Sequence, residues 1–242
     1  RHLSVAVLGV STLAALAGTT PGPLAAQVPA RAERPVQFIV MFQGVRIGSE
    51  RVEVTRNDNG WLITSTGQIA APLDLTTTRF EVSYASDWQP QKLAIEGSHK
   101  GQLITLLTVF QPASATSDVL QSGQRLSVTH KVSPRTIALP SNFFGAYEAL
   151  AAQLGTASVG AKFPVYVAPQ AEVMLTVEAT RPRRIITVDG PMDLRQFDLT
   201  FANPSGPLKA EIWIDGRNRF ARLALPASSV TVIRDDLATV LA

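Results

Sequence analysis

The sequence predicts a mainly β protein, an antiparallel meander that curls into a barrel or half-barrel, with one α-helix covering or plugging it. Alternating apolar and polar residues recur from Val36 to Arg234, as expected of strands with one buried face. Turn signals such as Asn203-Pro-Ser-Gly-Pro207 separate these runs at spacings of about 8–12 residues, which are typical of sandwiches and barrels. One helical pattern interrupts the strands at about residues 141–154, and an antiparallel sheet needs such a cover on one face.

The first meander is expected over residues 36–132. Glu50–Arg56 alternates between charged residues and the pair Val52 and Val54, which indicates a half-buried strand. Asn57-Asp-Asn-Gly60 is a hairpin turn, since Asn and Gly accept positive φ. Leu103–Phe110 is apolar on both faces, so we expect it to be covered on both sides. The expected strands are 36–42, 45–56, 61–70, 79–84, 92–96, 103–110 and 125–132.

The mid-chain helix has recognisable ends and an apolar surface. Ser141 after a proline is the expected N-cap, and Gly155 is the expected C-cap. The residues Phe143, Tyr147, Leu150 and Leu154 form one stripe at helical spacing. The opposite face is mostly alanine, so we expect this helix to be buried on more than one side.

A second meander is expected over residues 162–236. Its turns include Asp215-Gly-Arg-Asn218, and Trp213 lies on the polar side of its strand, where it marks an exposed patch or a second packing surface. The expected strands are 163–168, 172–180, 184–189, 194–201, 208–214, 219–225 and 230–234.

The N-terminus predicts a secretory signal peptide over residues 1–27. Leu3–Ala17 is an apolar run after Arg1 and His2, and Leu24-Ala-Ala-Gln27 offers small residues for cleavage. The run is shorter than the roughly 20 apolar residues of a membrane span, so we expect no transmembrane anchor after cleavage. A polar linker over residues 28–35 and a single β-rich domain over residues 36–242 follow. This order predicts an exported bacterial protein, periplasmic or secreted.

Composition narrows the possible partners. The formal net charge is only +3 over 242 residues, and the densest cationic cluster, Arg181-Pro-Arg-Arg184, is too short for a nucleic-acid interface. The chain has no cysteine, which excludes disulfides, thiolate metal sites and an acylated N-terminal cysteine. We therefore expect no nucleic-acid partner.

No motif for catalysis, a metal or a cofactor stands out. Gly155-Thr-Ala-Ser-Val-Gly160 has one residue too many for a nucleophile elbow and follows a helix. His130 lies on an apolar strand face without a second ligand at metal-binding spacing, so we expect a hydrogen-bonded core residue. Asp235 and Asp236 are adjacent, and other aspartates lie at turns, where they bond locally to the backbone. We expect no catalytic residue, no metal and no cofactor.

The order of elements resembles a known group of proteins. Phe42-Gln-Gly-Val-Arg-Ile-Gly48 precedes the charged strand, and Ile212-Trp-Ile-Asp-Gly-Arg217 lies in the second meander. With the mid-chain helix, this layout resembles uncharacterised exported bacterial β-half-barrel proteins, whose sheets look like those of the periplasmic Lol lipoprotein carriers. The tail, which ends in Val232-Ile-Arg-Asp-Asp-Leu237, also resembles the β-rich segment before the catalytic domain of some secreted α/β-hydrolases.

The leading hypothesis is a non-enzymatic exported protein that binds an apolar or amphiphilic, lipid-like ligand in a groove between sheet and helix. The expected ligand contacts are the apolar helix residues Phe143, Phe144, Tyr147 and Leu150. The tryptophans are further candidates for lining a cavity, with core packing as the alternative. The second hypothesis is a structural or accessory interaction module, the N-terminal part of a secreted α/β-hydrolase. The third is an enzyme with spatially assembled carboxylates.

Overall fold

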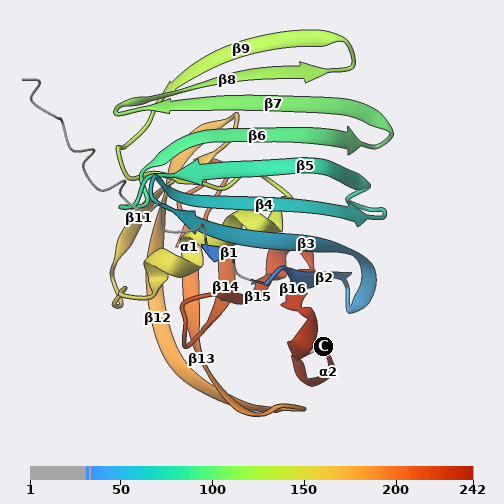
Figure 1. Ribbon diagram of the computed structural model, residues 1–242, viewed down its shortest axis with the longest axis vertical. Coiled ribbons are helices and arrows are strands. Elements are labelled where there is room, and N and C mark those ends of the chain that lie inside the picture. The colour runs from blue at the N-terminus through green and yellow to red at the C-terminus, as the bar shows by residue number, and fades with distance from the viewer. Residues whose placement is uncertain (1–30, 33, 242) are drawn as a thin grey trace, which may run out of the picture.

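The computed structural model describes residues 31–32 and 34–241, and it confirms the predicted fold class. Fifteen strands follow one another in a single open sheet that curves around one helix (Figure 1). The predicted signal peptide lies outside the described residues. Within the described residues, no helix is both long enough and apolar enough to cross a bilayer.

Two meanders make up the sheet. The first contains β2 (Val36–Phe42), β3 (Val45–Asn57), β4 (Gly60–Ile69), β5 (Leu75–Tyr84), β6 (Pro90–His99), β7 (Gln102–Gln111), β8 (Ser114–Gln121) and β9 (Gln124–Lys131). The second contains β10 (Ile137–Ala138), β11 (Lys162–Val167), β12 (Ala171–Thr187), β13 (Gly190–Phe201), β14 (Leu208–Asp215), β15 (Phe220–Leu225) and β16 (Val230–Arg234). In the predicted linker, the short β1 (Arg31–Ala32) pairs with β3.

The pairing of the last strand with β2 joins the two meanders. The order runs from β10 through β16 to β2 and on to β9. Every pair is antiparallel except β10 with β11. Among the described strands, this order leaves β9 paired on one side only, so that it forms an edge of the sheet at the top of Figure 1.

The predicted helix ends where expected but begins later. A 3₁₀ turn, η1 (Phe144–Ala146), leads into α1 (Tyr147–Leu154), and Gly155 follows as the C-cap. The prediction of Ser141 as N-cap is wrong, because no side chain of the adjoining loop caps the helix. A carboxylate from β3 caps it instead: Glu50 accepts hydrogen bonds from the amides of Phe144 and Gly145, at 2.9 and 3.0 Å.

The core lies between the concave sheet and this helix. Stacked aromatic pairs connect the elements: Phe80 contacts Phe143 with ring centroids 5.8 Å apart, and Phe220 contacts Phe38 and Tyr147. A second, smaller cluster packs under η3 (Asp235–Leu237) and α2 (Ala238–Leu241), and Trp213 packs against it. The interpretation of Trp213 as a marker of a second packing surface is therefore confirmed. The remaining short helix is η2 (Pro226–Ser228).

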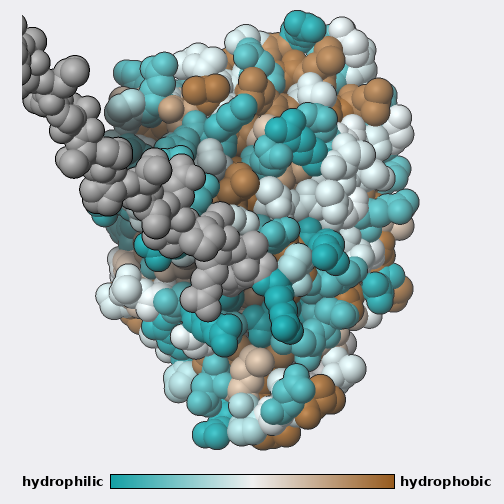
Figure 2. Space-filling view, in the orientation of Figure 1, coloured by the Kyte–Doolittle hydropathy of each residue, from teal (hydrophilic) through white to brown (hydrophobic). Residues whose placement is uncertain are grey.

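The expectation that 103–110 is covered on both faces is wrong. Leu103 and Val109 on β7 are 78% and 45% exposed, and Figure 2 shows apolar residues interspersed with polar ones toward the top of this face. An apolar run reveals that two faces are apolar but not whether a second layer exists to cover the outer one.

Side chains link the two ends of the open sheet. The Tyr166 hydroxyl on β11 lies 3.2 Å from Ser117 Oγ on β8 and 3.1 Å from His130 Nδ1 on β9. Glu172 accepts hydrogen bonds from the amide and hydroxyl of Ser133. The interpretation of His130 as a hydrogen-bonded residue is confirmed, but its placement in the core is wrong, because His130 is only half-buried on β9 at the edge of the sheet.

Candidate functional site

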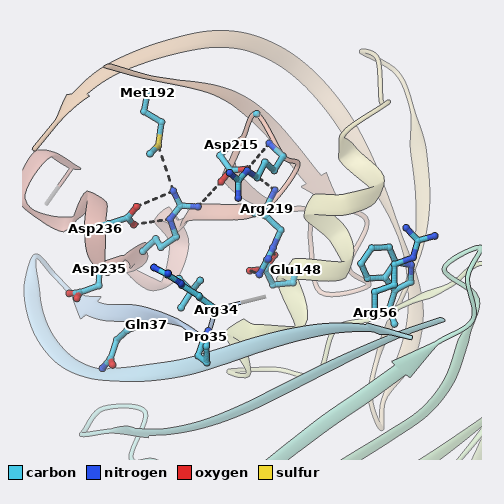
Figure 3. A pocket seen from close by; sticks show the side chains of 15 residues that line it. Arg34, Pro35, Gln37, Arg56, Glu148, Met192, Asp215, Arg219, Asp235 and Asp236 are labelled. Atoms are coloured by element: carbon cyan, nitrogen blue, oxygen red, sulfur yellow. Dashed lines mark hydrogen bonds and ion pairs between the residues drawn. The ribbon is translucent and has the colours of Figure 1, made fainter. Parts of the chain in front are cut away.

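A pocket of about 1350 Å³ opens beside α1, between the two meanders. Its walls come from the start of β2, the hairpin of β3 and β4, and the ends of β14 and β16 (Figure 3). The lining residues are Arg34, Pro35, Val36, Gln37, Arg56, Trp61, Glu148, Met192, Asp215, Gly216, Arg217, Arg219, Arg234, Asp235 and Asp236. Five guanidinium groups and four carboxyl groups therefore share one cavity.

A buried ion pair fixes the helix side of the pocket. Glu148 of α1 accepts two hydrogen bonds from Arg219, at 2.8 and 2.9 Å, and a third from the amide of Phe220 at 3.1 Å. Burial raises the pKa of Glu148 to about 8, while these hydrogen bonds stabilise its charged form. Burial also lowers the pKa of Arg219 to about 10. Perturbed groups in a cleft mark a candidate functional site.

A second ion-pair group forms the opposite wall. Arg234 donates to Asp236 at 2.7 Å and to Asp215 at 2.8 Å, and it contacts Met192 Sδ at 3.5 Å. Burial acts to lower the pKa of Arg234, but the hydrogen bonds to the two aspartates outweigh it and raise that pKa. Arg234 is thus held in place by carboxylates on two separate segments.

Asp215 performs two tasks in this wall. Its Oδ1 accepts from the amides of Arg217 and Arg219, at 2.9 and 3.0 Å, which is the local turn bonding expected from the sequence. Its Oδ2 binds Arg234. The turn motif therefore also shapes the pocket.

The remaining arginines have no carboxylate partner within the described residues. Arg34, Arg56 and Arg217 are exposed and form no ion pair in that part of the chain. The Arg56 guanidinium lies 5.0 Å from the ring centroid of Trp61, which stacks on Trp88 at 4.8 Å. Of the three tryptophans proposed as cavity-lining residues, only Trp61 lines this pocket. Trp88 stacks on Trp61, and Trp213 packs against the second, smaller cluster.

The four predicted ligand contacts on the helix lie elsewhere. Phe143, Phe144 and Leu150 are buried and Tyr147 is half-buried, and all four belong to or pack against the main core. None of them lines this pocket. Their role as ligand contacts stays a prediction.

The arginine pocket was missed at the sequence level because its residues are scattered from Arg34 to Asp236. One signal was present: Glu148 is a rare strongly polar residue on an otherwise apolar helix, and such a residue needs a partner when the helix is buried. No group of three or more His, Cys, Asp or Glu side chains suited to a metal occurs in residues 31–32 and 34–241. Comparison with protein-family models, curated proteins and solved structures found no match.

Proposed function

We propose that this chain is an exported, non-enzymatic protein that binds an amphiphilic ligand with an anionic head group in the groove between the sheet and α1. The observation that carries the proposal is the pocket beside Glu148, where guanidinium groups outnumber carboxyl groups and apolar residues line the same cavity. The same proposal includes the resemblance of this sheet to the sheets of the periplasmic Lol lipoprotein carriers.

The head group is expected at the lining arginines that form no ion pair with any described residue. Arg219 and Arg234 are already bound by carboxylates, whereas Arg34 and Arg217 are exposed to the pocket. A guanidinium forms paired, charge-assisted hydrogen bonds to phosphate or carboxylate oxygens. These two arginines therefore favour an anionic head group over a neutral one.

The apolar part of the ligand is expected over Val36, Trp61 and Met192. The volume of about 1350 Å³ exceeds that of typical small-molecule pockets, about 300–1,000 Å³, which leaves room for a chain as well as a head group. Burial of that chain contributes about 25 cal/mol per Å². A chain reaches Leu150 and Phe144 only if α1 shifts from its packed position.

The test is a binding measurement with matched amphiphiles. We expect dodecyl phosphate to bind, and dodecyl maltoside, with the same chain and a neutral head group, to bind more weakly. The double variant Arg34→Gln/Arg217→Gln should lose more than about tenfold in affinity for dodecyl phosphate, because charged hydrogen bonds are the strongest polar contacts. Isothermal titration calorimetry gives both affinities.

The control is Arg125→Gln/Arg135→Gln, which removes two exposed arginines that do not line the pocket. It should bind dodecyl phosphate as the wild type does. Native mass spectrometry and lipid extraction of the purified protein give an independent measurement. Equal affinities for the two amphiphiles, or no bound ligand and no uptake of either, would overturn the proposal.

A further inference from the structure

An apolar row of side chains crosses the first meander on its core-facing side and ends at a free edge. The strand register places Phe80, Ile95, Leu106, Val119 and Leu126 next to one another on β5 to β9. The exposed fraction rises along this row from 0% at Phe80 and 2% at Ile95 to 58% at Leu126. The core thus extends to β9 and leaves its last apolar side chain uncovered.

The same edge presents unpaired backbone groups. Val132 donates its amide to Ala113 at 3.2 Å, which sets the alternation: even-numbered residues of β9 bond to β8, and odd-numbered ones point away. The outward groups belong to Arg125, Ser127 and Thr129. Within the described residues, β9 pairs with β8 alone, and no other backbone hydrogen bond reaches these three residues.

The positive charge of the β9 edge indicates which kind of strand can pair with it. Arg125 and Lys131 share the outer face of β9, and the strand Gln124–Lys131 contains no Asp or Glu. A second copy of this chain that paired through β9 would bring cations together without a carboxylate between them, and edge cations oppose such pairing. A strand that carries carboxylates would complement them.

We propose that the edge of β9 binds an extended segment of another protein in which acidic and apolar residues alternate. The segment adds as one more strand, so that its apolar side chains continue the row beyond Leu126 and its carboxylates lie beside Arg125 and Lys131. This interface is separate from the arginine pocket, since β9 is five strands away from β4 (Figure 1).

The experiment uses the full chain and two synthetic peptides of 8 residues, the length of β9. One alternates Val and Glu, and the other alternates Val and Lys. We expect the Val-Glu peptide to bind and the Val-Lys peptide to bind at least about tenfold more weakly. Fluorescence anisotropy measures both affinities, and hydrogen exchange should show new protection of the Ser127 and Thr129 amides.

Two variants separate the backbone from the charge contribution. Ser127→Pro removes one outward backbone donor at a position where an edge strand accepts proline. It should lower the affinity for the Val-Glu peptide at least about tenfold. Ser127→Ala keeps that donor and should leave the affinity unchanged. The charge swap Arg125→Glu/Lys131→Glu keeps every backbone group and should reverse the peptide preference. Equal binding of both peptides, no binding of either, or a β9-dependent dimer in light scattering would overturn the proposal.

Discussion

Two buried carboxylates attach the helix to both halves of the sheet. Glu50 on β3 accepts hydrogen bonds from the first amides of the helical segment and from the hydroxyl of Ser65. Glu148 on α1 accepts hydrogen bonds from Arg219 and from the amide of Phe220. Each residue thus joins the helix to a different meander. A buried carboxylate is costly unless its oxygens are satisfied, and here each oxygen has a donor.

The pH dependence of the free energy of unfolding should reveal the raised pKa values of these carboxylates. Burial raises the pKa of Glu50 above its ordinary value and raises that of Glu148 to about 8. The folded state therefore binds more protons than the unfolded state between about pH 5 and 8. Stability from Glu148 is fully present below its unfolded pKa and is lost as pH rises toward 8, by up to about 1.4 kcal/mol per pH unit. Urea unfolding at several pH values measures this slope.

The variant Glu148→Gln removes one titrating group and should flatten that slope. The control Glu178→Gln changes an exposed carboxylate and should keep the wild-type slope. If Glu148→Gln and the wild type gave parallel curves of unfolding free energy against pH, the raised pKa would be wrong.

The helical element is positioned by close contact as much as by its own sequence. A β-carbon on Gly145 would lie 2.9 Å from Glu50 Oε1 and 3.1 Å from Val52 Cγ2, so only glycine lets β3 approach the first turn. The amides of Phe144 and Gly145 are satisfied by a carboxylate distant in sequence, which no local motif reveals.

Gly145→Ala should destabilise the protein by about 1–3 kcal/mol, because the added methyl group overpacks the junction and displaces Glu50. Gln153→Ala on the same helix is the control. Its side-chain amide nitrogen is buried and has no hydrogen-bond partner among the described residues, so truncation should cost less than about 1 kcal/mol. Thermal and urea unfolding compare the two. A larger loss for Gln153→Ala would contradict this account of the junction.

At the scale of the whole molecule, an open sheet must keep its two ends in place without a backbone ladder. Tyr166, which is fully buried, brings its hydroxyl to Ser117 and His130 across the gap. The edge strands β8 and β9 otherwise rely on their neighbours in the first meander. Such an edge is a region of low local stability.

Tyr166→Phe keeps the ring and removes the hydroxyl. The expected loss of global stability is about 1 kcal/mol, and amide hydrogen exchange should accelerate in β8 and β9 more than in β3 or β14. Tyr147→Phe is the matched control, because the Tyr147 hydroxyl forms no hydrogen bond with the described residues and the ring packs on Phe220. A uniform acceleration across the sheet after Tyr166→Phe would contradict a local role.

The sequence by itself determined the mainly β class, the covering helix with its C-terminal end, and most of the strands and turns. It did not reveal β8, Ser114–Gln121, and it divided β12, Ala171–Thr187, into two strands. The features that it determined depend on local pattern: period-two alternation, a helical apolar stripe, and residues such as Asp215 that bond to their own turn. The same local pattern gave His130 as a hydrogen-bonded residue and Trp213 as part of a second packing surface. Each of these properties is encoded within a few neighbouring residues.

Only the tertiary structure decided which face of β7 stays uncovered, which residue caps the helix and where the charged pocket lies. Arg34, Glu148 and Arg234 meet because β16 pairs with β2 and joins the two meanders. Glu50 accepts hydrogen bonds from residues almost a hundred positions later in the chain, because the helical segment packs on β3. Long-range strand pairing leaves no mark in the residues nearby, so the elements of this protein can be predicted from its sequence, and the site that they form together cannot.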